Sequence, residues 1–260
     1  MSLPAKVLVV TLAAIIVVLM IVPLLSIIGE INYGDDSDAE IHQVNYSWKY
    51  DGTAYSIDIE ISENIISGYT NTLIPRSPSL FIMPRYVTEE DPVIKNVASK
   101  LSDMTKGMTE LDRASFILRF VQKNIDYVRD SDAHGKREYW QFPLETLLHR
   151  TGDCEDSSLL FLTLMRTMEY DAVLFIMPGH VAVGLSVEGA TGHSVSHDGI
   201  DYYFCETTNS RGIGDSSQEV SRVLTVNSMI SHYFLMLFLG VLILLIYVGI
   251  KFDRSENDAT

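Results

Sequence analysis

Two long uncharged stretches enclose the rest of this chain and constrain its fold more than any other feature. Residues 7–29 and 233–250 contain no Asp, Glu, Lys or Arg. As helices, both can span about 30 Å of hydrocarbon. We therefore expect a transmembrane helix in residues 1–29, a second in 229–250, and one folded domain between them. A cleaved signal peptide is the alternative for the first stretch, although its apolar run is longer than such peptides usually have.

The charges beside these stretches predict an orientation. Lys6 precedes the first stretch, and Lys251 and Arg254 follow the second. Because positive charge is retained on the inner side of a membrane, both termini, including a tail of residues 251–260, are expected in the cytoplasm. The predicted localisation is an integral membrane protein whose middle domain is extracytoplasmic.

The middle domain is acidic. The two ends hold equal numbers of acidic and basic residues, so the whole net charge of −15 falls between them. Such a charge argues against a nucleic-acid partner and against adhesion to anionic lipid headgroups. It is compatible with a basic or neutral polypeptide partner, or simply with solubility.

Local patterns divide the middle domain into two regions. Residues 30–90 predict a linker and a β-hairpin, because residues 45–50 and 53–62 alternate in polarity around Asp51-Gly52. Residues 91–228 predict the core, beginning with helices over 92–106 and 109–124.

One cysteine lies where a helix should begin. Residues 157–170 lack proline and glycine and are apolar nearly all round, as in a helix buried in a core. Gly152 and Asp153 predict a turn and an N-cap, so Cys154 is expected at the positive end of the helix dipole. Glu155 and Asp156 oppose thiolate formation. A nucleophilic Cys154 would therefore need a cationic imidazole beside it to lower its pKa.

A histidine and an acid follow on predicted strands. Residues 173–177 and 180–187 are β-branched runs separated by Pro178-Gly179, and residues 202–208 predict the next strand. His180 shares its strand face with small residues, which leaves room for a substrate. Glu206 is expected to point toward His180, with Cys205 on the opposite face. Cys154, His180 and Glu206 are thus candidates for a nucleophile, its base and an orienting carboxylate.

Structural roles compete with this interpretation. A lone buried cysteine is most often an inert core residue, and a lone histidine is most often a satisfied structural one. A Cys154–Cys205 disulfide is another alternative for an exported domain. His193 and His197 have a spacing that would suggest metal ligands on a helix, but glycines at both ends of residues 189–199 predict a mobile loop instead, so no metal is expected.

The chain contains five blocks in the order of a known family, at residues 120–127, 142–147, 152–156, 178–184 and 202–208. Together they resemble the transglutaminase-like superfamily, and most closely its membrane-anchored archaeal and bacterial branch. The resemblance implies an α+β, papain-like fold in which the cysteine helix packs on an antiparallel sheet. It implies Cys154 as nucleophile, His180 as base and Glu206 in a position where animal transglutaminases have aspartate. Trp140 and Gln141 lie where the family often has an oxyanion donor.

The expected function is that of a membrane-anchored thiol enzyme. A cysteine peptidase or amidase would cleave polypeptide amide bonds through a thioester, and it needs no cofactor. The alternatives are a protein-glutamine cross-linking acyltransferase, in which an amine replaces water, and a non-catalytic binding module of the cell envelope. The expected partners are a polypeptide substrate and, through the two helices, membrane lipid.

Overall fold

The computed structural model describes residues 39–226, except 77–78 and 217, together with Gly240. The described part of residues 30–226 belongs to one unit, Glu30–Val226. No helix among the described residues has the length and apolar character to cross a bilayer. Apart from Gly240, the predicted transmembrane segments 1–29 and 229–250 and the tail 251–260 lie outside the described residues.

Helices form where the sequence provides caps. The Asp91 side chain accepts hydrogen bonds from the first backbone N–H groups of α3, and the Thr109 side chain does the same for α4. Asp153 caps α7. The described helices are α2 (Glu63–Thr70), the 3₁₀ helix η1 (Met83–Tyr86), α3 (Pro92–Met104), α4 (Glu110–Asn124), α5 (Asp130–Ala133), α6 (Pro143–His149) and α7 (Cys154–Thr167).

The predicted hairpin is present. Strands β1 (Ile41–Tyr50) and β2 (Thr53–Ser62) are antiparallel, and Asp51 and Gly52 form the turn with φ of 45° and 75°. Two successive residues with positive φ match the right-handed twist of the strands. The Trp48 ring packs edge-on against the Phe116 ring of α4, with the ring centroids 5.2 Å apart, so the hairpin lies against α4.

A five-stranded antiparallel sheet follows the cysteine helix. Its order is β7-β8-β6-β5-β9, and the turn between β5 and β6 is Pro178-Gly179, with Gly179 at a φ of 68°. A separate parallel pair, β3 with β4, precedes α7. The strands are β3 (Asp126–Tyr127), β4 (Thr151–Gly152), β5 (Asp171–Met177), β6 (His180–Ser186), β7 (Ser194–His197), β8 (Ile200–Cys205) and β9 (Arg222–Thr225).

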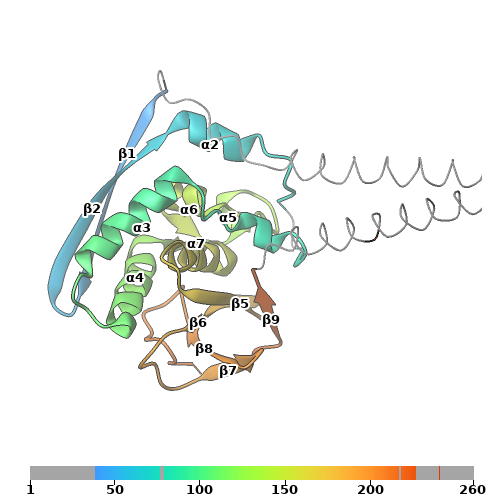
Figure 1. Ribbon diagram of the computed structural model, residues 1–260. Helices are drawn as coiled ribbons and strands as arrows, with labels where there is room; N and C mark the ends of the chain where they lie inside the picture. The colour runs from blue at the N-terminus through green and yellow to red at the C-terminus, as the bar shows by residue number, and fades with distance from the viewer. Residues whose placement is uncertain (1–38, 77–78, 217, 227–239, 241–260) are drawn as a thin grey trace, which may run out of the picture. The chain divides into compact units, whose positions relative to one another are not determined.

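Helix α7 is the centre of the unit. It packs against β5 and β6 on one side and against α3, α4 and α6 on the other (Figure 1). Residues 159–162 are completely buried, as the apolar pattern predicts. The mixed α and β architecture, with the cysteine helix on an antiparallel sheet, therefore agrees with expectation.

Two local predictions need correction, and one helix was not expected. The strand expected over 202–208 ends at Cys205, so Glu206 lies just beyond it. Part of the loop expected over 189–199 is strand β7, because Ser194 and Val195 pair with Tyr203 and Tyr202 of β8. Helix α2 was not expected; its N-cap, Ser62, is the last residue of β2.

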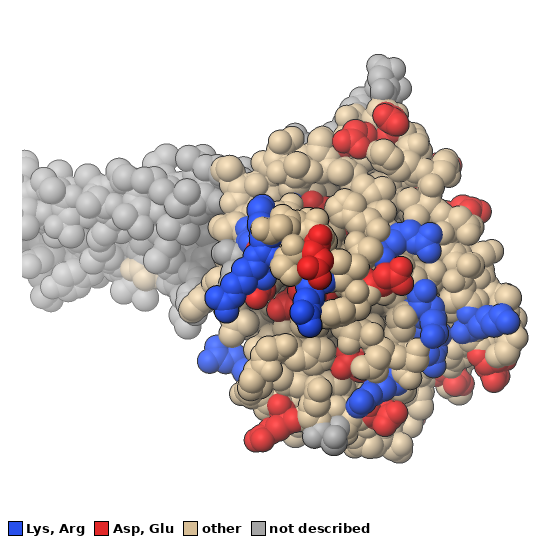
Figure 2. Space-filling model, turned by 180° about the vertical axis from the view of Figure 1, so that it is seen from behind, with Lys and Arg blue, Asp and Glu red and all other residues tan. Residues whose placement is uncertain are grey.

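Charges of both signs are scattered over one face of the molecule. Lys and Arg side chains alternate with Asp and Glu over the face seen in Figure 2. Acidic side chains are therefore not gathered into one patch on that face. Basic side chains do not form there a patch of the kind that binds nucleic acid either.

Candidate active site

The start of α7 holds Cys154 in place. The Asp153 side chain accepts a hydrogen bond from the Glu155 N–H at 3.2 Å, and the Asp156 side chain accepts one from the Asp153 N–H at 3.3 Å. This reciprocal arrangement is a capping box. Gly152 is required before it, because a Cβ there would lie 2.6 Å from the Asp156 Cβ. Cys154 is the first helical residue and is 7 % exposed.

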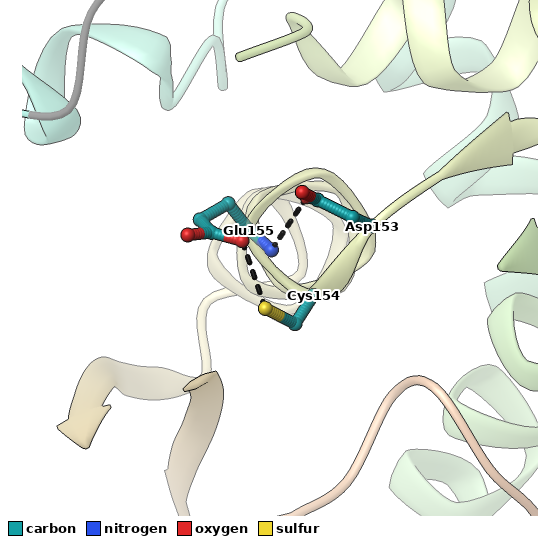
Figure 3. Close-up of side chains that lie close together, drawn as sticks. All are labelled: Asp153, Cys154 and Glu155. Carbon is teal, nitrogen blue, oxygen red and sulfur yellow. Dashed lines mark hydrogen bonds between the residues drawn. The ribbon is translucent and has the colours of Figure 1, made fainter. Parts of the chain in front are cut away.

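The Cys154 thiol contacts an acid rather than a base. Its Sγ donates to Glu155 Oε2 at 2.8 Å, and Figure 3 shows the two groups pointing toward each other at the first turn of α7. Burial raises the pKa of the Cys154 thiol far above its usual range, and the charge and hydrogen bond of Glu155 raise it further. The expectation of a lowered pKa is therefore not met in this conformation, since burial and then the carboxylates of Glu155 and Asp153 disfavour the thiolate.

His180 and Glu206 are brought together. His180 Nε2 lies 2.9 Å from Glu206 Oε2, with the two side chains 20 % and 5 % exposed. Glu206 Oε1 accepts from the backbone N–H and the hydroxyl of Thr208. Burial alone would raise the pKa of Glu206, but the hydrogen bonds from His180 and Thr208 hold it below its usual value. This carboxylate is thus ionised and holds the ring through Nε2.

The thiol lies beside the residue that follows His180. Against the larger effect of burial, the nearby backbone N–H of Val181 acts to lower the pKa of the Cys154 thiol. The Ser158 hydroxyl, also on α7, donates to the Val181 carbonyl at 3.1 Å. The first turn of α7 therefore packs on the start of β6. Among the described residues, no hydrogen bond joins the Cys154 thiol directly to the His180 ring.

The two oxyanion candidates differ. Both N–H groups of the Gln141 side chain are used, at 3.0 Å to the Thr151 carbonyl and at 2.9 Å to Asp156 Oδ2. Its carbonyl oxygen lies 2.6 Å from His149 Nδ1. Gln141 therefore has no N–H left for a substrate. The indole N–H of Trp140 is buried and has no partner among the described residues, so it keeps its capacity to donate.

Four polar residues that support the site were not expected. Gln122 of α4 donates to the backbone carbonyl of Glu206 at 2.7 Å. Ser157, Ser158 and Thr207 form a buried set of hydroxyl groups. These residues stand within or beside the sequence blocks already noted, but nothing in the sequence shows which of them meet.

Metal binding is not needed to explain the acidic helix start. Asp153, Cys154 and Glu155 present ligand atoms within 4.8 Å of one another. Each side chain already has a protein partner, since Asp153 caps the helix and the thiol donates to Glu155. His193 Nδ1 lies 3.2 Å from the Ser216 carbonyl oxygen, so that ring too has a protein partner.

The second cysteine is separate from the site. Cys154 and Cys205 are both free thiols, which excludes the disulfide alternative in this structure. Cys205 is completely buried and belongs to the apolar core.

Two surface grooves lie away from these residues. One of about 710 Å³ lies between the hairpin and α4, and another of about 400 Å³ lies between α3 and the end of α7. Neither is lined by Cys154, His180 or Glu206. The chemistry-bearing groups therefore stand at a helix end against a strand rather than inside either groove.

Comparison with known proteins gives one family and several distant solved structures, of which two are described here. A family model for a transglutaminase-like domain matches residues 93–191. A "putative protease" from Parabacteroides distasonis ATCC 8503 is 14 % identical, with a TM-score of 0.35, over 68 % of this chain and 41 % of the other. A structure described as a TGase is 12 % identical, with a TM-score of 0.33, over 68 % of this chain and 47 % of the other.

The family match and the two structural matches support different conclusions. The chain spans less than half the length of either solved structure. Since both TM-scores are below 0.5, the two structures support no conclusion about activity. No curated protein matches the sequence. The family model includes both Cys154 and His180, and on that match residues 93–191 belong to the transglutaminase-like superfamily.

Proposed function

We propose that this protein is a thiol acyl-transfer enzyme, acting as a cysteine peptidase or amidase on polypeptide amide bonds. The observation that carries the proposal is the 2.9 Å contact between His180 Nε2 and Glu206 Oε2, beside a helix that begins with a cysteine. Because Nε2 is held by the carboxylate, the neutral ring carries its proton there and leaves Nδ1 as the acceptor. Cys154, His180 and Glu206 take the roles of nucleophile, base and orienting acid.

The first step in this mechanism is a rearrangement of the thiol. Cys154 leaves the Glu155 carboxylate and transfers its proton to His180 Nδ1, which forms an imidazolium stabilised by Glu206. The thiolate attacks the carbonyl carbon of an amide, and the carbonyl π electrons move to oxygen. Donors for that oxyanion are the backbone N–H of Cys154 and the indole N–H of Trp140.

Collapse of the tetrahedral intermediate completes acylation. The C–N bond breaks, His180 returns its proton to the leaving amine, and a thioester on Cys154 remains. Water then attacks the thioester with His180 as base, which releases the acid and restores the thiol. A primary amine in place of water would produce a cross-link. The Glu155 carboxylate beside the thiol favours that alternative, because it attracts a cationic amine, which gives a proton to His180 before it attacks.

Labelling by an activity-based thiol probe tests the nucleophile. We expect wild-type protein to be labelled near neutral pH and Cys154→Ala to lose the label. Cys205→Ala is the matched control, because Cys205 is completely buried and should not contribute. Equal labelling of wild type and Cys154→Ala would reject the assignment. An unlabelled wild type would favour a non-catalytic binding module.

The acceptor is identified by trapping. Acylated protein is divided between buffer and buffer containing a labelled primary amine, and the products are compared by mass spectrometry. Release of free acid in both samples supports hydrolysis. Incorporation of the amine as the main product would instead assign the cross-linking reaction.

The proposal includes a membrane tether. Residues 7–29 and 233–250 support it through their lack of charge and their length. Both termini would be cytoplasmic and the domain extracytoplasmic. Resistance of the full chain to alkaline extraction from membranes is the expected result, with the domain cleaved by protease added outside intact cells. Release into the alkaline supernatant would reject the tether. Protection of the domain from protease would reject its orientation.

A further inference from the structure

Three buried hydroxyl groups meet behind Cys154, and we name Ser157, Ser158 and Thr207 the hydroxyl cluster. Thr207 Oγ1 lies 2.9 Å from Ser157 Oγ and 3.2 Å from Ser158 Oγ. All three residues are at most 3 % exposed. Water therefore has little access to these groups, and their hydrogen bonds are made within the protein.

The hydroxyl cluster joins the three segments that carry the proposed catalytic residues. Ser157 and Ser158 lie in the first turns of α7, after Cys154. Ser158 Oγ donates to the carbonyl of Val181, the residue after His180. Thr207 follows Glu206 directly. One set of contacts therefore sets the spacing among the thiol, the imidazole and the carboxylate.

The number of hydroxyl hydrogens fixes the direction of these bonds. Ser157 Oγ donates to the Asp153 carbonyl at 2.8 Å, and Ser158 Oγ donates to the Val181 carbonyl at 3.1 Å. A hydroxyl has one hydrogen, so with these two bonds made Thr207 is the donor toward the serines, and its single hydrogen serves mainly the nearer oxygen, that of Ser157 at 2.9 Å. The Thr207 hydroxyl is thus the donor that joins the segment after β8 to α7. Removing the Thr207 hydroxyl leaves both serine hydrogens bonded to their carbonyls, so only the connection between Thr207 and α7 is lost.

We propose that Thr207 is a positioning residue, which holds the His180–Glu206 pair in reach of Cys154 through its hydroxyl. This inference rests on the proposed function and deepens it. Misplacement of reacting groups by about 1 Å can lower a rate ~100-fold, so loss of one anchoring bond should be visible in kinetics. Thr207 touches no reacting atom in this account and acts through the residues beside it.

The test compares full-length variants by alkylation of Cys154. Thr207→Val removes the hydroxyl at nearly constant shape, and Thr207→Ser restores it. Thr163→Val is the matched control. Like Thr207, Thr163 is buried, but it lies in α7 and its hydroxyl donates only to the Leu159 carbonyl of the same helix. The readouts are the pH profile of iodoacetamide alkylation and, with a peptide substrate, kcat and KM separately.

The expected result is a loss of about tenfold or more in kcat for Thr207→Val, with KM nearly unchanged and an altered alkylation profile. Thr207→Ser and Thr163→Val should retain the wild-type profile. An active wild type with an unchanged Thr207→Val profile would overturn the inference and leave the proposed function intact. A wild-type Cys154 that does not react would reject both.

A second variant serves if Thr207→Val does not fold. Ser158→Ala removes the connection from α7 to Val181 and should alter the same profile. If Ser158→Ala folds and reacts as wild type does, the positioning role of the hydroxyl cluster is rejected.

Discussion

The Cys154 thiol donates its hydrogen bond to the carboxylate of Glu155, its neighbour in the chain, at 2.8 Å. A thiol in this contact is protonated, and the carboxylate raises its pKa. The proposed nucleophile therefore rests in an unreactive form. Reaction requires the thiol to turn from Glu155 toward the imidazole on β6.

Glu155→Gln should make Cys154 more reactive at neutral pH. Burial remains, but the negative charge that raises the thiol pKa is removed, so the pKa falls. Each unit of decrease increases the thiolate fraction about tenfold at a pH below the pKa. Iodoacetamide alkylation measured from pH 6 to 10 tests this. Glu169→Gln, at an exposed turn position two residues beyond the end of α7, is the control. Identical profiles for Glu155→Gln and wild type would show that Glu155 does not restrain the thiol.

Glu206→Gln should reduce stability at neutral pH more than in acid. The folded-state pKa of Glu206 is lowered, so the folded protein binds that proton less tightly than the unfolded chain. The stabilisation is therefore present above the unfolded pKa of about 4.3 and is lost as the pH falls through the folded pKa.

Urea unfolding of wild type and Glu206→Gln at pH 7 and pH 3 measures this effect. Comparison of the two proteins at each pH is needed, because burial shifts Asp91 and Asp156 in the opposite direction, raising the pKa of Asp156 to about 7. The difference in free energy of unfolding should shrink at pH 3. The exposed Glu188→Gln provides the control, with no such change. A constant difference would show that the His180–Glu206 contact does not stabilise the fold.

Gly152→Ala should destabilise the start of α7. The added Cβ would meet the Asp156 side chain at 2.6 Å, and Asp156 belongs to the capping box. Overpacking of this kind typically costs about 1–3 kcal/mol. Gly212→Ala is the matched control, since a Cβ at that position meets open space and Gly212 does not have a positive φ. Equal midpoints for both variants in urea unfolding would disprove the steric explanation.

Arg76→Met should be strongly destabilising. Arg76 makes a two-pronged ion pair with Glu145, and the two side chains are 15 % and 6 % exposed. Removing one partner of a buried pair leaves a charge without compensation, at a cost of about 3–5 kcal/mol. The double variant Arg76→Met/Glu145→Gln should regain part of that loss. Lys95→Met removes an exposed pair with Glu90 and should change stability by less than about 1 kcal/mol. A similarly small effect for Arg76→Met would contradict this account.

Much of the fold around the site could be predicted because it depends on residues close in the chain. Asp153 caps α7, as Gly152-Asp153 before an apolar run predicted, and Asp51-Gly52 forms the expected turn. The sheet carrying His180 follows from β-branched alternation. The end of β8 before Glu206 was missed, because Thr208 and Gln122 hold Glu206 through bonds that alternation does not encode.

The amino-acid sequence by itself determined which residues can carry thiol chemistry and which elements present them, since helix caps, turns and strand periodicity are local properties. Tertiary structure decided what those residues meet. It buried the thiol, occupied the Gln141 amide, and joined Ser157 to Thr207 across 50 residues of sequence. The reason is physical: pKa and hydrogen bonding depend on burial and on distances through space, and both arise only when the chain has packed.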